Sequence, residues 1–165
     1  MTCKSTVVFF GLGVFLGLPF AVRLSGIMLN STDSVPVGLY CQVRTGPYAG
    51  ICLEKKAFEG TGLQLDRGDC PAGVEPILKP LYIASAKHPI RFTEAGFSVD
   101  GTLLRNTAPK SYSRTGVMLH HFNFGEYTSG IFAISDFNRD SFDSRYFGPV
   151  EPDSIRFYAK PVWMF

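Results

Sequence analysis

Residues 30–40 read Asn30-Ser31-Thr32-Asp33-Ser34-Val35-Pro36-Val37-Gly38-Leu39-Tyr40 and separate an apolar N-terminal segment from the polar remainder of the chain. Pro36 fixes its backbone φ angle and removes a backbone donor, and Gly38 permits a turn or a close backbone approach. Ser34 therefore lies on a stiff loop. Its hydroxyl is a nucleophile only if a base lies within reach, because serine is a weak nucleophile unless activated. The alternative is a polar cluster that makes local turns or caps a helix.

An uncharged apolar run, residues 7–22, precedes this loop and is followed by Arg23. Its length lies between that of a signal-peptide core, about 7–15 residues, and that of a spanning helix, about 20 residues. We expect residues 1–29 to form a retained membrane anchor, since no small-x-small cleavage site precedes a polar mature start. Lys4 then places the N-terminus in the cytoplasm and residues 30–165 in the periplasm. A cleaved signal with a free periplasmic domain, or a buried core helix, is the alternative.

The composition predicts one domain behind this anchor and argues against several partners. Hydrophobic residues make up 45% of the 165-residue chain, enough for a sizeable core. The formal net charge is only +2 and the basic residues are scattered, so we expect no nucleic-acid partner. No Cys-x-x-Cys or Cys/His spacing typical of a metal site is present, and we expect neither a metal nor a cofactor.

The cysteines predict a disulfide if the domain lies in an oxidising compartment. Cys41, Cys52 and Cys70 follow the apolar run, and two of them could pair. We favour the pair Cys52–Cys70, which closes a loop over residues 54–69 and leaves Cys41 over.

Beyond residue 39 the pattern is mostly that of β-strands. Asp100-Gly101 between two short apolar runs is a strong hairpin signal. Residues 54–69 form a charged excursion with some helical character. The expected strands are 39–43, 49–53, 75–84, 97–99, 102–104, 131–135 and 155–163.

Lys79 is the first residue that turns Ser34 into a candidate nucleophile. It lies in the apolar run Ile77-Leu78-Lys79-Pro80-Leu81, where burial of a cationic amine is costly. Burial lowers the pKa of a lysine because desolvation penalises the cation, and a neutral amine can accept a serine proton. The alternative is a lysine on a strand edge whose amine reaches water.

A third polar block spans residues 138–150 and reads Asn-Arg-Asp-Ser-Phe-Asp-Ser-Arg-Tyr-Phe-Gly-Pro-Val. Its short polar side chains beside Arg139 and Arg145 predict a hydrogen-bonded loop with internal ion pairs. A plain surface loop is the alternative, and exposed ion pairs contribute little to stability.

These three blocks together resemble the type I signal peptidases. Ser34-Val35-Pro36 resembles the segment of their nucleophile, Ile77-Leu78-Lys79 that of their lysine, and residues 138–148 their C-terminal signature, all in the family's order. The form Ser-x-Pro-x-Gly-Leu-Tyr, the loop Gly68-Asp69-Cys70-Pro71 and the run 75–80 are closer still to the TraF-type maturation proteases. That signal-peptidase-like family serves conjugative plasmid transfer and processes and cyclises pilin.

The resemblance implies a mostly β catalytic domain, an antiparallel barrel or sheet, behind an N-terminal membrane helix. It also implies a role for each matched residue. Ser34 would be the nucleophile, Lys79 the general base and Asp143 a third catalytic residue. Support would come from Thr32, which helps the Ser34 N–H bind the oxyanion, from Ser141, which orients the lysine amine, and from Arg145, which pairs with Asp143.

The function expected from the resemblance is a membrane-anchored serine–lysine peptidase that cleaves, and in some cases cyclises, a pilin precursor. Its partners would be that precursor, the cytoplasmic membrane and components of the mating-pair or type IV secretion apparatus. A non-catalytic module of the same apparatus is the alternative. The chain departs from the signal-peptidase pattern at Val35, which replaces a methionine, and at residues 85–89, which replace a glycine turn. His120 and His121 match no catalytic position and are expected to be exposed.

Overall fold

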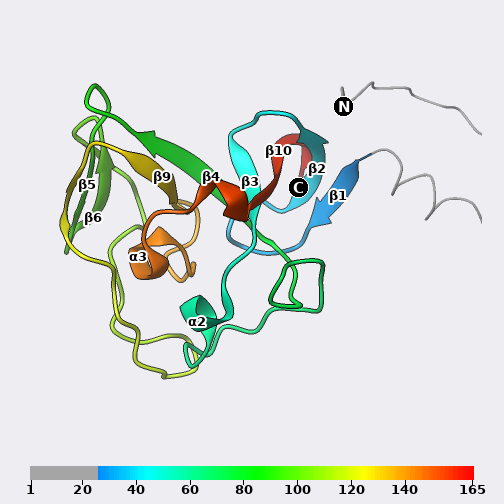
Figure 1. Ribbon diagram of the computed structural model, residues 1–165, viewed down its shortest axis with the longest axis horizontal. Coiled ribbons are helices and arrows are strands. Elements are labelled where there is room, and N and C mark those ends of the chain that lie inside the picture. The colour runs from blue at the N-terminus through cyan, green and yellow to red at the C-terminus, as the bar shows by residue number, and fades with distance from the viewer. Residues whose placement is uncertain (1–25) are drawn as a thin grey trace, which may run out of the picture.

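The computed structural model describes residues 26–165, which fold mostly as β-structure with short helices (Figure 1). The expected N-terminal membrane helix falls almost entirely outside the described residues. Within residues 26–165, no helix has the length and apolar character needed to cross a membrane.

The larger of two sheets has six strands in the order β1-β2-β10-β3-β4-β9. All neighbouring strands run antiparallel. The strands are β1 (Ile27–Asn30), β2 (Gly38–Val43), β3 (Tyr48–Ile51), β4 (Ile77–Ala84), β9 (Gly130–Ala133) and β10 (Ile155–Met164). Over residues 26–165 the sheet stays open, because its end strands β1 and β9 are not neighbours. Of the two expected forms, barrel or sheet, the structure has the open sheet.

The smaller sheet has four antiparallel strands in the order β7-β6-β5-β8. It lies at the opposite end of the molecule from β1 and β2 (Figure 1). Its strands are β5 (Ile90–Thr93), β6 (Gly96–Val99), β7 (Thr102–Leu103) and β8 (Gly125–Tyr127). The helices between the strands are α2 (Lys55–Phe58), α3 (Ser144–Phe147) and a 3-10 turn (Pro152–Ser154).

Each of the seven strands expected from the sequence is present, with ends that differ by a few residues. The hairpin at Asp100-Gly101 joins β6 to β7, and the helical character expected in residues 54–69 is the single turn α2. Three strands were not expected: β1, β5 and β8. Residues 27–29 of β1 were counted with the membrane segment, yet they pair with β2 in the sheet. Three apolar residues that continue an apolar run carry no period by which a strand could be recognised.

One of the three core clusters joins the neighbours of Ser34 and Lys79. Its buried members are Val35, Tyr40, Leu78 and Ala159. Val35 follows Ser34 and Leu78 precedes Lys79 in the sequence, so packing of their apolar neighbours draws the two polar residues together. A second cluster packs between β3, β9 and the C-terminal loop, and a third packs on the smaller sheet, with buried Phe92, Phe97 and Phe132.

Gly38, at the start of β2, makes the close backbone approach expected of it. A Cβ atom at this position would lie 2.1 Å from the carbonyl oxygen of Trp163 on β10. The approach lets β2 and β10 pair up to the point where β2 leaves the Ser34 loop.

The disulfide Cys52–Cys70 expected from the sequence is present. It joins the chain just after β3 to the loop that leads into β4, so it closes the 54–69 excursion. The expectation that Cys41 would be left over is wrong, because no cysteine among residues 26–165 is free. That expectation considered pairs among Cys41, Cys52 and Cys70 only.

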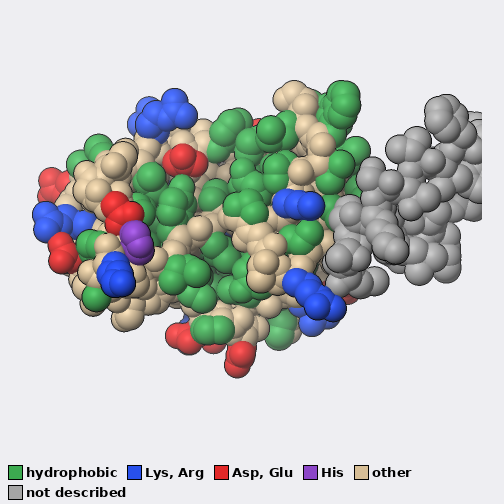
Figure 2. All heavy atoms as spheres, turned by 90° about the horizontal axis from the view of Figure 1, so that it is seen from above, with side chains coloured by type: hydrophobic (Ala, Val, Ile, Leu, Met, Phe, Trp, Pro, Cys, Tyr) green, Lys and Arg blue, Asp and Glu red, His purple; other side chains and the backbone are tan. Residues whose placement is uncertain are grey.

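Hydrophobic side chains occupy much of the middle of the face seen in Figure 2, and charged side chains lie mostly toward its edges. His120 and His121 are both exposed, as expected.

Candidate active site

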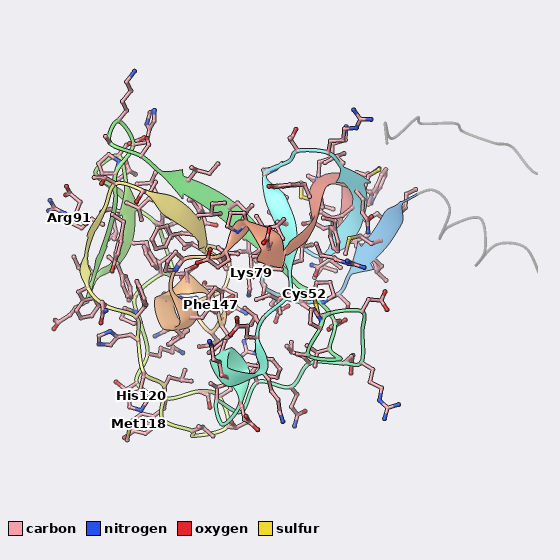
Figure 3. The ribbon with its side chains drawn as sticks, viewed as in Figure 1. Cys52, Lys79, Arg91, Met118, His120 and Phe147 are labelled. Carbon is pink, nitrogen blue, oxygen red and sulfur yellow. A yellow bond between two sulfur atoms is a disulfide. The ribbon has the colours of Figure 1, made fainter. Side chains whose placement is uncertain are left out.

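Lys79 lies in the third position of β4, opposite Ala49 of β3. Its side chain points into the molecule near its centre (Figure 3), and only 2% of the residue is exposed. The alternative of an edge lysine with its amine in water is therefore wrong. β4 has β3 on one side and β9 on the other, so it is an interior strand, despite Pro80.

Ser34 lies on the loop between β1 and β2 and is half-buried. Val35 beside it is fully buried, and the hydroxyl of Tyr40 donates to the carbonyl of Pro36 at 2.7 Å. The loop is thus attached to the core on the side of residues 35–40 and leaves the Ser34 hydroxyl facing Lys79.

Three polar atoms meet at the centre of the site. The amine nitrogen of Lys79 lies 2.7 Å from the Ser34 Oγ and 2.5 Å from the Ser141 Oγ. The Ser141 hydroxyl is in turn 3.4 Å from the Ser34 Oγ. Ser34 and Lys79 are 45 residues apart in the chain and Ser34 and Ser141 are 107 apart, so only the tertiary fold brings them together.

Burial shifts the charge state of the Lys79 amine. Desolvation lowers the pKa of Lys79 from its ordinary value of 10.5 to about 8. The negative charge of Asp143 opposes this shift, and the positive charge of Arg145 reinforces it. A large fraction of the amine is therefore neutral just above pH 8, and in that form it can accept a proton from a hydroxyl at hydrogen-bond distance.

Asp143 and Arg145 form an ion pair that is completely buried. Arg145 Nε donates to Asp143 Oδ1 at 2.8 Å and Arg145 Nη2 donates to Asp143 Oδ2 at 2.9 Å. Burial alone would lower the pKa of Arg145, but the charge of Asp143 and its hydrogen bonds raise it above its ordinary value. The ion pair expected in this loop is present, and it is an internal one.

Arg145 also gathers the backbone of the surrounding loops. Its guanidinium donates to the carbonyl oxygens of Asn106, Arg139 and Ser141 at 2.8–3.0 Å. Longer bonds reach two more carbonyls at 3.4 Å. The bond to the Ser141 carbonyl fixes the residue whose hydroxyl contacts Lys79.

Asp143 contacts neither Ser34 nor Lys79 directly in the hydrogen bonds of the described chain. Its Oδ2 accepts the backbone N–H of Ser135 at 3.0 Å, and the Ser135 hydroxyl donates to the carbonyl of Ser34 at 2.5 Å. Asp143 therefore reaches the Ser34 loop through Ser135.

The hydroxyl of Thr32 is bonded to the side chain of Asn30. It donates to the side-chain oxygen of Asn30 at 2.8 Å, and the Thr32 backbone N–H donates to the same oxygen at 3.3 Å. In this structure its proton is thus engaged by Asn30.

Two residues that hold the site were missed, Asn30 and Ser135. Both are buried and polar. Asn30 is the first residue of the stretch 30–40, but β1 was not expected, so nothing in the sequence marked Asn30 as the end of a strand. Ser135 closes an expected strand and carried no signal, since its partner Ser34 is 101 residues away in the chain.

A cleft of about 460 Å³ opens beside these groups. Ser34 and Lys79 line it. The other lining residues come from segments 28–33, 61–66 and 75–78 and from the loops that follow β7 and β9. The segment 61–66 belongs to the loop that the disulfide between Cys52 and Cys70 closes. The arrangement places the Ser34 hydroxyl, with the Lys79 amine at hydrogen-bond distance, at the side of this cleft.

No family model matches the chain, and no solved structure matches it. Curated proteins do match over nearly its whole length. It is 32% identical over 162 residues to "Plasmid transfer protein TraF" of Escherichia coli, an alignment that covers 92% of this chain and 91% of the relative. A second Escherichia coli protein of that name is 29% identical over 84% of this chain and 83% of its own length.

A third relative, "Conjugal transfer protein TraF" of Agrobacterium fabrum, is 25% identical over all of this chain and 99% of its own length. Because these alignments span almost the complete chains, they include the residues of the site. The chain belongs to the family of TraF proteins of conjugal plasmid transfer.

Proposed function

We propose that this chain is a serine endopeptidase of conjugal transfer that uses Ser34 as nucleophile and Lys79 as general base. The observation that carries the proposal is the distance of 2.7 Å between the Lys79 amine and the Ser34 hydroxyl in a buried site. A structural lysine gains nothing from such burial, because desolvation of its cation costs free energy. For a general base the same burial is useful, because it brings the pKa of the amine near the pH at which the protein works.

In the proposed reaction the neutral Lys79 amine removes the proton of Ser34 as Oγ attacks the scissile carbonyl carbon. Ser141 holds the amine in place through its hydroxyl. The Ser34 N–H would bind the developing oxyanion, and a donor of this kind lowers the activation barrier by about 3 kcal/mol. Thr32 can assist only if its hydroxyl turns from Asn30.

Collapse of the tetrahedral intermediate breaks the peptide C–N bond. The leaving amine takes the proton from the Lys79 ammonium, and an ester of Ser34 remains. Water then attacks the ester and releases a carboxylate, or an incoming N-terminal amine attacks it and closes a ring. In both cases Lys79 accepts the proton of the incoming group and returns it to Ser34.

The proposed substrate is a pilin precursor, and the proposed setting is the mating-pair or type IV secretion apparatus. The TraF names of the relatives support a role in conjugal transfer. The resemblance of the three site segments to signal-peptidase-like maturation proteases supports the precursor as substrate. Asp143 is proposed as a positioning group, since it reaches Ser34 through Ser135.

We also propose that the protein is anchored in the cytoplasmic membrane with the β domain in the periplasm. The apolar run of residues 7–22 supports this, and so does an apolar row across β1, β2 and β10 whose outer members are exposed. Leu29, Leu39 and Trp163 are aligned across β1, β2 and β10. Leu29 is 62% exposed and Trp163 is 65% exposed. Tryptophan is typical of the membrane–water interface.

Substitution of either member of the dyad should abolish processing. Ser34→Ala and Lys79→Ala should each lower kcat by roughly 10²–10⁴-fold or more, because each removes nucleophilic or general-base catalysis. Lys79→Arg should not restore activity, since arginine stays protonated. Mass spectrometry of the pilin from cells with each variant measures this, and a mass one water below the linear peptide reports a ring. Substantial turnover by Lys79→Arg would refute the dyad. Normal processing by Ser34→Ala would favour the non-catalytic alternative.

The rate of processing should rise with pH along a limb near pH 8. Only the neutral amine accepts the Ser34 proton, so activity is lost below the lysine pKa of about 8 and is full above it. A free lysine would place the limb near pH 10.4. The measurement is kcat/KM against pH with detergent-solubilised protein. A maximum at acidic pH would contradict the mechanism.

Asp143→Asn should both slow processing and destabilise the fold. The amide leaves the buried Arg145 without its counter-charge, which costs about 3–5 kcal/mol. Chemical denaturation and activity should be measured on one preparation. Asp100→Asn is the matched control, because Asp100 pairs with the exposed His88 and should change stability by no more than about 0.5 kcal/mol. A stable and fully active Asp143→Asn protein would show that the carboxylate is dispensable.

The single tryptophan, Trp163, should contact lipid when the full chain is reconstituted in vesicles. Brominated lipids should then quench its fluorescence. The control carries Trp163→Phe together with Phe124→Trp, which moves the fluorophore next to β8 in the smaller sheet and should not be quenched. Equal quenching of both proteins, or of neither, would count against the proposed orientation at the membrane.

A further inference from the structure

Most of the loop that carries Ser34 is held by side chains, and a backbone bond from the N–H of Phe165 holds Val37 at its end. Residues 31–37 lie between β1 and β2 and belong to neither strand. Pro36 has no backbone N–H to contribute. A loop without a ladder shifts easily, and a displacement of about 1 Å at a reacting atom can cost about 10² in rate. Whatever fixes this loop therefore controls the chemistry.

Asn30 fixes the loop from its N-terminal side. It ends β1 and is only 5% exposed. Its Nδ2 donates to three carbonyl oxygens of the loop, at 2.9 Å to Thr32, 3.2 Å to Val35 and 3.2 Å to Pro36. Its Oδ1 accepts from the backbone and the hydroxyl of Thr32. One amide thus binds the chain before and after Ser34.

Ser135, which follows β9, fixes the same loop from another part of the chain. It is fully buried, and its hydroxyl donates to the carbonyl oxygen of Ser34 itself at 2.5 Å. Its own backbone N–H donates to Asp143, so the buried ion pair holds it in place. The carbonyl oxygen of Ser34 accepts no hydrogen bond from a neighbouring strand, and the Ser135 hydroxyl donates to it instead.

We propose that Asn30 and Ser135 are positioning residues that together orient the Ser34 peptide and aim its Oγ at the Lys79 amine. The inference rests on the proposed function, because it assigns these two residues to the same reaction. Neither is among the residues that contact the Lys79 amine, so both act through the backbone of the loop.

Two variants test the contributions of Ser135 and Asn30 separately. Ser135→Ala deletes one hydroxyl and leaves the backbone bond to Asp143. Asn30→Asp keeps an oxygen for Thr32 but loses the three bonds to carbonyls. In each case kcat should fall roughly 10–100-fold. For Ser135→Ala, KM should stay within about twofold, because Ser135 is not among the residues that line the cleft, whereas Asn30 is. The pH limb of Ser135→Ala should stay where it is in the unchanged protein, since Lys79 keeps its surroundings.

A small phosphonylating reagent for serine provides the second readout. It is far smaller than a peptide substrate and has only to reach the Ser34 Oγ, so its rate of reaction with Ser34 should fall in parallel with kcat. Asn123→Asp and Ser129→Ala make the same chemical changes at exposed positions and should leave both rates unchanged. Thermal unfolding confirms that the compared variants are folded, and Ser135→Ala decides the matter if Asn30→Asp does not fold.

Unchanged kcat and reagent rate in folded Ser135→Ala would overturn the inference. A raised KM with unchanged kcat would overturn it as well, because that pattern belongs to substrate binding. Ser34→Ala in the same assay separates this from failure of the proposed function. If Ser34→Ala is inactive while both positioning variants are fully active, only the inference fails. If Ser34→Ala is fully active, the proposed function itself fails.

Discussion

The buried ion pair between Asp143 and Arg145 is the interaction on which the site depends. Two opposite charges without solvent exposure are costly to desolvate, and the cost is offset only when every donor and acceptor is engaged. Here the carboxylate accepts from Arg145 and from the Ser135 backbone, and the guanidinium binds carbonyls of several loops. The pair thus joins the loop after β7, the loop after β9 and α3 into one rigid support.

The charge state of Lys79 depends on how the neighbouring residues pack in the core. Its neighbour Leu78 and the neighbour of Ser34, Val35, belong to one apolar cluster. Apolar burial of these neighbours stabilises the fold, and it simultaneously carries the amine out of water and against the serine hydroxyl. The lowered pKa of Lys79 is therefore a result of core packing. A polar environment at the same distance would leave the amine protonated and unable to act as a base.

The sequence was most informative where residues of one kind repeat or where the chain carries a recognisable block. Seven strands follow from alternating or apolar runs, and Ser34, Lys79 and Ser141 were correctly expected to lie together. β1 was missed because its few residues continue an apolar run. Asn30 and Ser135 were missed because they hold the site by hydrogen bonds to backbone carbonyl oxygens. The sequence does not show which carbonyl oxygens the fold will bring next to a given side chain. The bond of the Thr32 hydroxyl is instead a local one, to the side chain of Asn30 two residues before it, and it was not expected from the sequence.

The disulfide between Cys52 and Cys70 divides the site into two parts that respond differently to reductants. One wall of the cleft, residues 61–66, lies within the covalent loop, whereas the contacts among Ser34, Lys79 and Ser141 involve no sulfur. Closure of a loop of this length restricts the unfolded chain and thereby stabilises the folded state by about 3 kcal/mol. Under reducing conditions the wall loses that restraint while the polar triad keeps its bonds. The shape of this wall therefore depends on the oxidised state of Cys52 and Cys70, whereas the contacts among Ser34, Lys79 and Ser141 do not.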